Sequence, residues 1–135
     1  MRKYSVLAAT ISALLLALIS TPANASVPAD GTYTCTTGNF TISSGSVTTH
    51  SSCAGAVVIP AGVTSIGTFT FYGTTALTSV TFAAGSTLTS IGNYAFYNAT
   101  SLTSITIPAS VTSIGAFAFY GTTALTSVYF LGDAP

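Results

Sequence analysis

The sequence predicts a β-rich solenoid, a coil of about three repeats of 23–25 residues that follows a β-structured N-terminal cap. Three observations predict this fold. A phrase that begins at Val63 recurs in similar form at Leu88 and at Val111. Apolar and polar residues alternate in the segment after each copy, as they do in a strand with one buried face. Each unit is too short to bury its own apolar side chains, so successive units must stack on one another.

Residues 1–25 are predicted to be a secretory signal peptide. Arg2 and Lys3 supply the positive start, Val6–Ile19 is a largely apolar run, and Ala23–Ala25 is a small-residue cleavage site. The alternative is a transmembrane anchor, but the run is shorter than the roughly 20 apolar residues that span a bilayer. The sequence therefore predicts a secreted or cell-surface protein without a membrane span in the mature chain.

Residues 26–56 are predicted to form the N-terminal β cap. The end of a solenoid exposes core and backbone, so the first rung of the coil needs a cover. The segment contains three candidate short strands, at residues 32–35, 40–42 and 46–49, and a turn at 43–45. It also holds the only two cysteines of the chain, Cys35 and Cys53. A secreted context favours a disulfide between them over two free buried thiols.

Residues 57–135 are predicted to form the solenoid. The apolar residues of its strands face the core at every second position, as Val80 and Phe82 illustrate. A glycine recurs after the second extended segment of each unit, where the chain needs either room or a positive φ; these glycines are Gly67, Gly92 and Gly115. The aromatic pair that follows each glycine is expected to fill the interior of the coil; the pairs are Phe69/Phe71, Tyr94/Phe96 and Phe117/Phe119.

The C-terminal end of the sequence is expected to be a truncation of this solenoid. Val128–Phe130 begins a fourth unit, and Pro135 is reached before any further Ile-Gly or Ala-Phe phrase. No capping segment is evident after it, so either further repeats or domains are expected to follow, which is the favoured interpretation, or the last strand is an open edge.

The repeat resembles the BspA-type leucine-rich repeat family, whose pattern runs Leu-x-x-Ile-x-Ile-Pro and then Val-x-x-Ile-Gly-x-x-Ala-Phe. Ala95-Phe96 and Ala118-Phe119 match its Ala-Phe pair, whereas Thr70-Phe71 departs from it. The family's Cys three residues after that Phe is replaced in all three units, by Thr74, Ala99 and Thr122. The resemblance covers Val57–Phe130. It implies a leucine-rich-repeat-like right-handed coil, a secreted or surface location and a protein-binding scaffold, often adhesive, and it supplies no catalytic residue.

The scarcity of charge excludes several functions. Charged residues make up 3% of the chain, and its only basic residues are Arg2 and Lys3. Nucleic-acid binding needs cations against phosphate, so it is not expected. A Ser-His-Asp triad would need Asp30, His50 and a serine, and nothing in the sequence positions these residues together. No group of His, Cys, Asp or Glu residues has the spacing of metal ligands. The sequence predicts no catalytic, cofactor or metal site.

The outward residues of the predicted strands form the candidate binding face. This face is uncharged and rich in hydroxyl groups, and it consists of Ser79, Thr81, Ser104, Thr106, Ser127 and Tyr129. The alternative interpretation is that Thr simply suits a pleated surface. A tyrosine also recurs in each unit and is expected to stack on one side of the coil, either to bind a ligand or to pack the rungs together; these residues are Tyr72, Tyr97 and Tyr120.

The predicted function is that of a secreted or cell-surface repeat scaffold for protein binding or adhesion, without catalysis and without a cofactor. Its partner is a protein or another cell-surface ligand. Two alternatives remain open, a structural spacer within a larger wall protein and an ice-binding solenoid. The outward residues mix Ser, Thr and Tyr, which disfavours ice binding because that function uses a regular threonine array.

Overall fold

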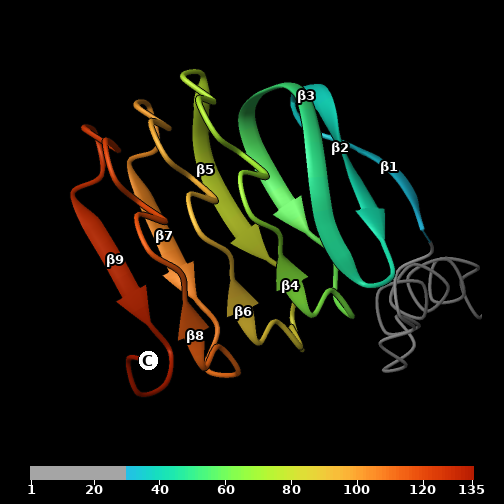
Figure 1. Cartoon of the computed structure of the whole chain (residues 1–135), viewed down its shortest axis with the longest axis vertical. Helices are drawn as coiled ribbons and strands as arrows, with labels where there is room; N and C mark the ends of the chain where they lie inside the picture. The colour runs from blue at the N-terminus through green and yellow to red at the C-terminus, as the bar shows by residue number, and fades with distance from the viewer. Residues whose placement is uncertain (1–29) are drawn as a thin grey trace, which may run out of the picture.

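The computed structural model describes residues 30–135, which form a β-solenoid (Figure 1). The predicted signal peptide lies outside the described residues. No helix occurs between residues 30 and 135. The strands in chain order are β1 (Gly31–Thr34), β2 (Thr37–Ser43), β3 (Ser46–Ile59), β4 (Ser65–Ile66), β5 (Leu77–Phe82), β6 (Ser90–Ile91), β7 (Ser104–Ile107), β8 (Ser113–Ile114) and β9 (Ser127–Phe130).

The coil consists of two rows of parallel strands. In the long-strand sheet, β5, β7 and β9 follow the C-terminal half of β3. In the short-strand sheet, β4, β6 and β8 follow the N-terminal half of β3. Both rows run from the cap toward the C-terminus, and each rung contributes one strand to each row (Figure 1). The predicted β-solenoid is confirmed.

Equivalent residues of successive rungs are direct neighbours. Ser79 pairs with Ser104, and Ser104 pairs with Ser127, although the first of these sequence intervals is two residues longer than the second. The additional residues lie in the turn between β5 and β6, where an insertion leaves the pairing of the strands unchanged.

The first rung of the coil is formed by β3 and was not predicted from the sequence. β3 is a single strand of 14 residues, far longer than the short strand expected at 46–49. Within it, Val47 pairs with Ile66 and Val57 pairs with Val80, so its two halves begin both rows. This rung lacks the Ile-Gly and Ala-Phe phrases that reveal the others. β3 also crosses the predicted boundary between cap and solenoid at residue 56, and that division stays a prediction.

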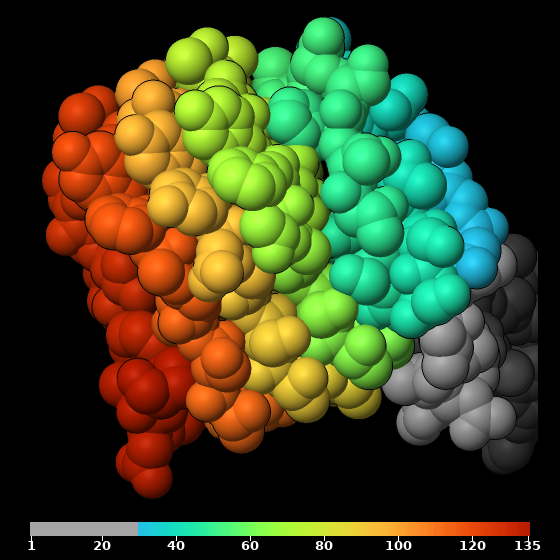
Figure 2. Space-filling view, in the orientation of Figure 1, coloured from blue at the N-terminus to red at the C-terminus, as the bar shows by residue number. Residues whose placement is uncertain are grey.

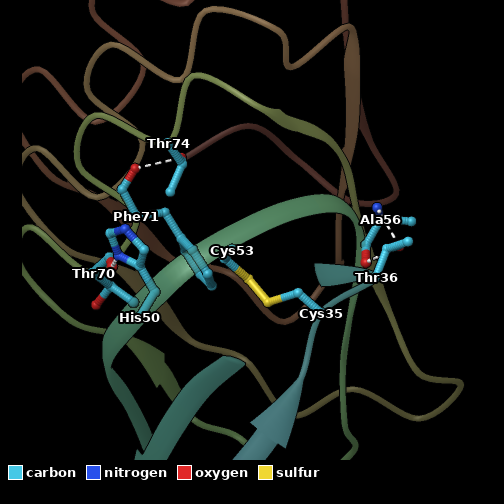
Figure 3. Close-up of a disulfide and its surroundings, with 8 residues drawn as sticks. All are labelled: Cys35, Thr36, His50, Cys53, Ala56, Thr70, Phe71 and Thr74. Carbon is cyan, nitrogen blue, oxygen red and sulfur yellow. Dashed lines mark hydrogen bonds between the residues drawn. A yellow bond between two sulfur atoms is a disulfide. The ribbon is translucent and has the colours of Figure 1, made fainter. Parts of the chain in front are cut away.

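The N-terminal strands cover the first half of β3. β1 pairs with β2 and β2 with β3, both antiparallel. The turn expected at residues 43–45 is present, with φ of 51° at Ser44 and 74° at Gly45. The Cys35–Cys53 disulfide ties the end of β1 to β3 with a Cα–Cα distance of 5.5 Å (Figure 3). Beside it, the backbone N–H of Ala56 donates to Thr36 Oγ1 at 3.0 Å.

One apolar core runs through all the rungs. The inward residues of β5 and β7, such as Val80 and Ile105, are buried as predicted. The prediction is wrong for Val128 and Phe130 of β9, which are 38% and 39% exposed because no further described rung covers them. Phe71 and Phe96 are fully buried and lie in a stack with Phe119, with ring centroids 5.3 and 5.4 Å apart. The core therefore continues from rung to rung through stacked rings as well as through aliphatic strand residues.

The prediction that both members of each aromatic pair fill the coil is wrong for the first member. Phe69 and Phe117 are 53% and 55% exposed, and Tyr94 is half-buried. All three have a positive φ, between 56° and 59°. Side chains two residues apart share a side only in extended backbone. The first residue of each pair is left-handed and not extended. Its ring therefore points outward, while the ring two residues later points into the core.

The recurring glycines provide room and do not provide a positive φ. A Cβ on Gly92 would lie 2.6 Å from the backbone N of Thr68, and a Cβ on Gly115 would lie 2.5 Å from that of Asn93. Neither glycine has a positive φ. The glycines are needed because the backbones of successive rungs approach one another closely at this point.

Candidate functional site

The six residues of the candidate binding face lie on one side of the long-strand sheet. They form two rows that run across the strands from rung to rung. The first row consists of Ala56, Ser79, Ser104 and Ser127, and the second of Val58, Thr81, Thr106 and Tyr129. We call this surface the strand face.

The strand face points away from the core, because residues that alternate with it in β5 and β7 are buried, as Val80, Ile105 and Ile107 are. Thr81, Ser104, Thr106 and Tyr129 are exposed, whereas Ser79 and Ser127 are half-buried. Ala56 and Val58 also belong to the strand face and were not predicted from the sequence. Both are exposed, but Val58 stands between two apolar residues, so polarity alone could not show which of them faces outward.

Most hydroxyl groups of the strand face are free. Within residues 30–135, five of its side-chain hydroxyls have no hydrogen-bond partner, namely those of Ser79, Ser104, Thr106, Ser127 and Tyr129. The sixth, that of Thr81, donates to the Val57 carbonyl at 3.3 Å. The free hydroxyls are available to a ligand without the loss of a bond inside the protein.

Other threonine rows of the coil are used differently. The hydroxyl of Thr103 donates to the carbonyl of Thr78, and that of Thr126 donates to the carbonyl of Thr103, both at 3.3 Å. Thr89 and Thr112 do the same one rung apart, at 3.0 and 3.3 Å. These hydroxyls link successive rungs, as that of Thr81 does, which distinguishes them from the five free hydroxyls of the strand face.

A hollow of about 320 Å³ opens beside the strand face. Thr81 and Thr106 form part of its lining together with the turn at residues 82–86, Pro108 and Leu131. Leu131 is highly exposed. The volume lies at the lower end of the range of ligand pockets, about 300–1,000 Å³. The hollow could accept one apolar side chain of a partner that rests on the hydroxyl rows.

The titratable residues of the described chain do not assemble into a reactive site. The ring of His50 stacks on Phe71 with centroids 5.8 Å apart, and its Nδ1 contacts the carbonyl oxygen of Thr70 (Figure 3). The Asp30 carboxylate accepts a hydrogen bond from the backbone N–H of Ser44 at 2.6 Å. Among the described residues, no three potential metal ligands lie together, and no helix is long and apolar enough to cross a membrane.

The recurring tyrosines stack as predicted. Tyr72, Tyr97 and Tyr120 form one column, with ring centroids 5.0 and 5.2 Å apart. The outward rings of the aromatic pairs form a second column beside it with spacings of 5.0 and 5.3 Å, and it consists of Phe69, Tyr94 and Phe117. We call the two columns together the aromatic ladder. It lies on the turns that lead from the short-strand sheet to the long-strand sheet.

The fold and its repeated surfaces define a parallel β-solenoid repeat protein. The model of the BspA-type leucine-rich repeat region matches residues 41–133 in six copies, and the chain belongs to this family. The match begins inside β2, ahead of Val57, where the sequence analysis placed the start of the resemblance.

Among solved structures, the chain is similar to a leucine rich cell surface protein from Faecalibacterium prausnitzii A2-165, whose crystal structure was determined at 1.80 Å resolution. The two are 22% identical over 76% of this chain, with a TM-score of 0.31. The chain spans 40% of the length of that protein. No curated protein matches the chain.

Proposed function

We propose that this protein is a non-catalytic repeat scaffold, displayed outside the cell, that binds a protein partner in adhesion through its strand face. The observation that carries the proposal is the set of five unpartnered hydroxyls arranged in two rows on an uncharged sheet surface. Membership of the BspA-type repeat family supports the role of a scaffold, since stacked repeats present extended binding surfaces.

The proposed location outside the cell has two supports. The N-terminal sequence has the charge and apolar pattern of a signal peptide. The Cys35–Cys53 bond belongs to the type that persists in oxidising compartments.

The chemistry of the strand face favours weak binding that is repeated many times. A hydroxyl hydrogen bond contributes about 0.5–1.5 kcal/mol net, and Tyr129 adds one exposed amphipathic ring. Rungs in a sheet are about 4.8 Å apart, so the surface of one chain is small. Many copies on one cell would raise the overall affinity through multivalency.

The same chemistry makes binding insensitive to salt. No residue of the strand face carries a charge, so dissolved ions have no ion pair to screen. Affinity for the partner should therefore stay nearly constant when sodium chloride is raised from low to high concentration.

The test is adhesion of the mature chain, residues 26–135, to surfaces coated with extracellular matrix proteins or with partner cells. We expect Thr81→Lys and Thr106→Lys to abolish adhesion, because each places a solvated cation within the hydroxyl rows. Thr123→Lys is the matched control, since Thr123 is exposed on a turn away from the strand face. Adhesion that survives both strand-face substitutions, or that collapses with salt, would overturn the proposal. Absence of all binding would favour the spacer role.

A further inference from the structure

The aromatic ladder is an exposed apolar surface that the strand face does not use. Phe69, Tyr72, Phe117 and Tyr120 are each about half exposed, and the two tyrosines of the middle rung lie between them. In the space-filling view, side chains of successive rungs line up in rows across the coil (Figure 2). Soluble proteins seldom expose a contiguous apolar patch of this kind unless it is an interaction site.

We propose that the aromatic ladder is a contact surface between two copies of this chain. It lies on a different side of the coil from the strand face, so this contact goes beyond the proposed binding of a protein partner. Three properties of the ladder favour a second copy over other occupants: the orientation of its rings, its period and its lack of charge.

The ring orientation favours contacts through edges. Tyr94 and Tyr97 are each stacked between the rings of the rungs on either side, so their faces are already covered. A sugar ring that binds to an aromatic residue uses the face of the aromatic ring, which disfavours a polysaccharide as the occupant. Ring edges instead pack well against other rings in a T-shaped arrangement.

The first and last rungs of the ladder already contain this edge-to-face contact, and the rings of the middle rung are tilted. The two rings of each rung meet at angles of 66°, 53° and 78°, with centroids 5.6 to 5.9 Å apart. Rings of a second ladder could repeat the arrangement against the exposed edges of these rings. Because a second copy has the same rung spacing, a contact made at one rung is available at the others.

The absence of charge permits two copies to approach. Without residues 1–25, the only charged side chains are those of Asp30 and Asp133, and the six ladder residues are all Phe or Tyr. Two ladders that meet therefore bring no like charges together. The hydroxyls of Tyr72, Tyr97 and Tyr120 have no partner within the described residues, so they can bond across the contact.

The size of the ladder indicates a weak and reversible dimer. An aromatic side chain buries about 150–250 Å² when fully covered, so four half-exposed rings and two less exposed ones offer on the order of 500 Å². Stable interfaces bury about 800 Å² per partner. Copies crowded on a cell surface would nevertheless associate, because many weak contacts act together.

The test is sedimentation equilibrium of the mature chain, residues 26–135, over a wide range of protein concentrations. We expect reversible dimerisation that sodium chloride does not weaken and that sodium sulfate strengthens. The double variant Tyr72→Lys/Tyr120→Lys should dimerise at least about tenfold more weakly, because like charges then face one another. The control Thr81→Lys/Thr106→Lys adds the same charge on the strand face and should dimerise like the wild type.

A measurement on the wild type keeps the test valid if the ladder variant does not fold. Tyr120 and Tyr129 are both 58% exposed, but only Tyr120 belongs to the ladder. Nitration by tetranitromethane, read by mass spectrometry, should decrease at Tyr120 as protein concentration rises and should stay constant at Tyr129.

Several results would overturn the proposal. These are a chain that stays monomeric at every concentration, a dimer that both double variants weaken equally, and nitration that decreases equally at both tyrosines. Retention of a monomeric chain on an uncharged polysaccharide, lost in the ladder variant, would also overturn it and would assign the ladder to a glycan.

Discussion

At the scale of single residues, the main feature of this protein is a bulky aromatic residue held at positive φ in three successive rungs. For a large side chain this conformation costs on the order of 1–3 kcal/mol. Two contacts offset the cost at Phe69: its ring stacks on Tyr94 at 5.0 Å, and its N–H donates to the carbonyl of Asn93 at 3.1 Å. The positive φ turns the ring to the outside of the coil, where it forms part of the aromatic ladder.

The inward and outward rings should differ strongly in their contribution to stability. Phe96 is fully buried between Phe71 and Phe119, so Phe96→Ala leaves a cavity and should lower the free energy of unfolding by about 3–5 kcal/mol. Tyr97 is only half-buried, and Tyr97→Ala should cost clearly less. Urea denaturation of both variants measures the difference, and Tyr97→Phe serves as the conservative control. Equal losses would contradict the assignment of inward and outward rings.

At the scale of secondary-structure elements, two kinds of link hold the strands together beyond the backbone ladder. Threonine hydroxyls bond the carbonyl of the preceding rung, as Thr89 and Thr112 do. The second link is the disulfide, which attaches the end of β1 to β3. Because β3 contributes to both rows of strands, the disulfide joins the cap to the first rung of the coil.

Loss of the disulfide should destabilise the protein without changing its fold. Its cysteines are 18 residues apart, and closing a loop of this length stabilises by about 3 kcal/mol in the chain-entropy model. The variant Cys35→Ser/Cys53→Ser should lose about that much free energy of unfolding in urea titrations. As a control, a reducing agent should lower the stability of the wild type and leave that of the double variant unchanged.

Thiol titration tests whether the bond forms in the protein. The wild-type chain, unfolded without reductant, should show no free thiol. Two reactive thiols, or a double variant as stable as the wild type, would contradict the role given to this bond.

At the scale of the whole molecule, the protein is quasi-one-dimensional. Each rung contacts only the rungs beside it, through strand pairing and stacked rings. In such a coil, stability is roughly a sum of rung terms and nearest-neighbour interface terms. The effect of a substitution should therefore depend on where its rung stands in the stack.

Hydrogen exchange should reveal this dependence on position. Phe119 belongs to the last described rung and is only partly buried, so Phe119→Ala should speed amide exchange in β8 and β9 and leave β3 protected. The equivalent change in the middle rung, Phe96→Ala, should speed exchange on both sides of it. Uniform acceleration by both variants would instead show that the coil unfolds as one cooperative unit.

The sequence by itself determined the features that depend on local pattern. The alternation of apolar and polar residues predicted the buried side chains of β5 and β7, such as Val80 and Ile105. The recurrence of Ser79, Ser104 and Ser127 predicted one face, because parallel rungs of equal register bring equivalent residues side by side. The count and setting of the two cysteines favoured the disulfide that the structure contains.

Only the tertiary structure decided the features that depend on contacts between distant segments. β3 forms the first rung by pairing with both β4 and β5, and no phrase in its own sequence shows this. Phe69 points outward because its own backbone is in the left-handed conformation. The alternation of apolar and polar residues does not predict a positive φ. The hydroxyl of Thr103 bonds another rung whereas that of Thr106 stays free. The two residues are identical in type, so the difference arises only when the neighbouring rung brings a carbonyl within reach.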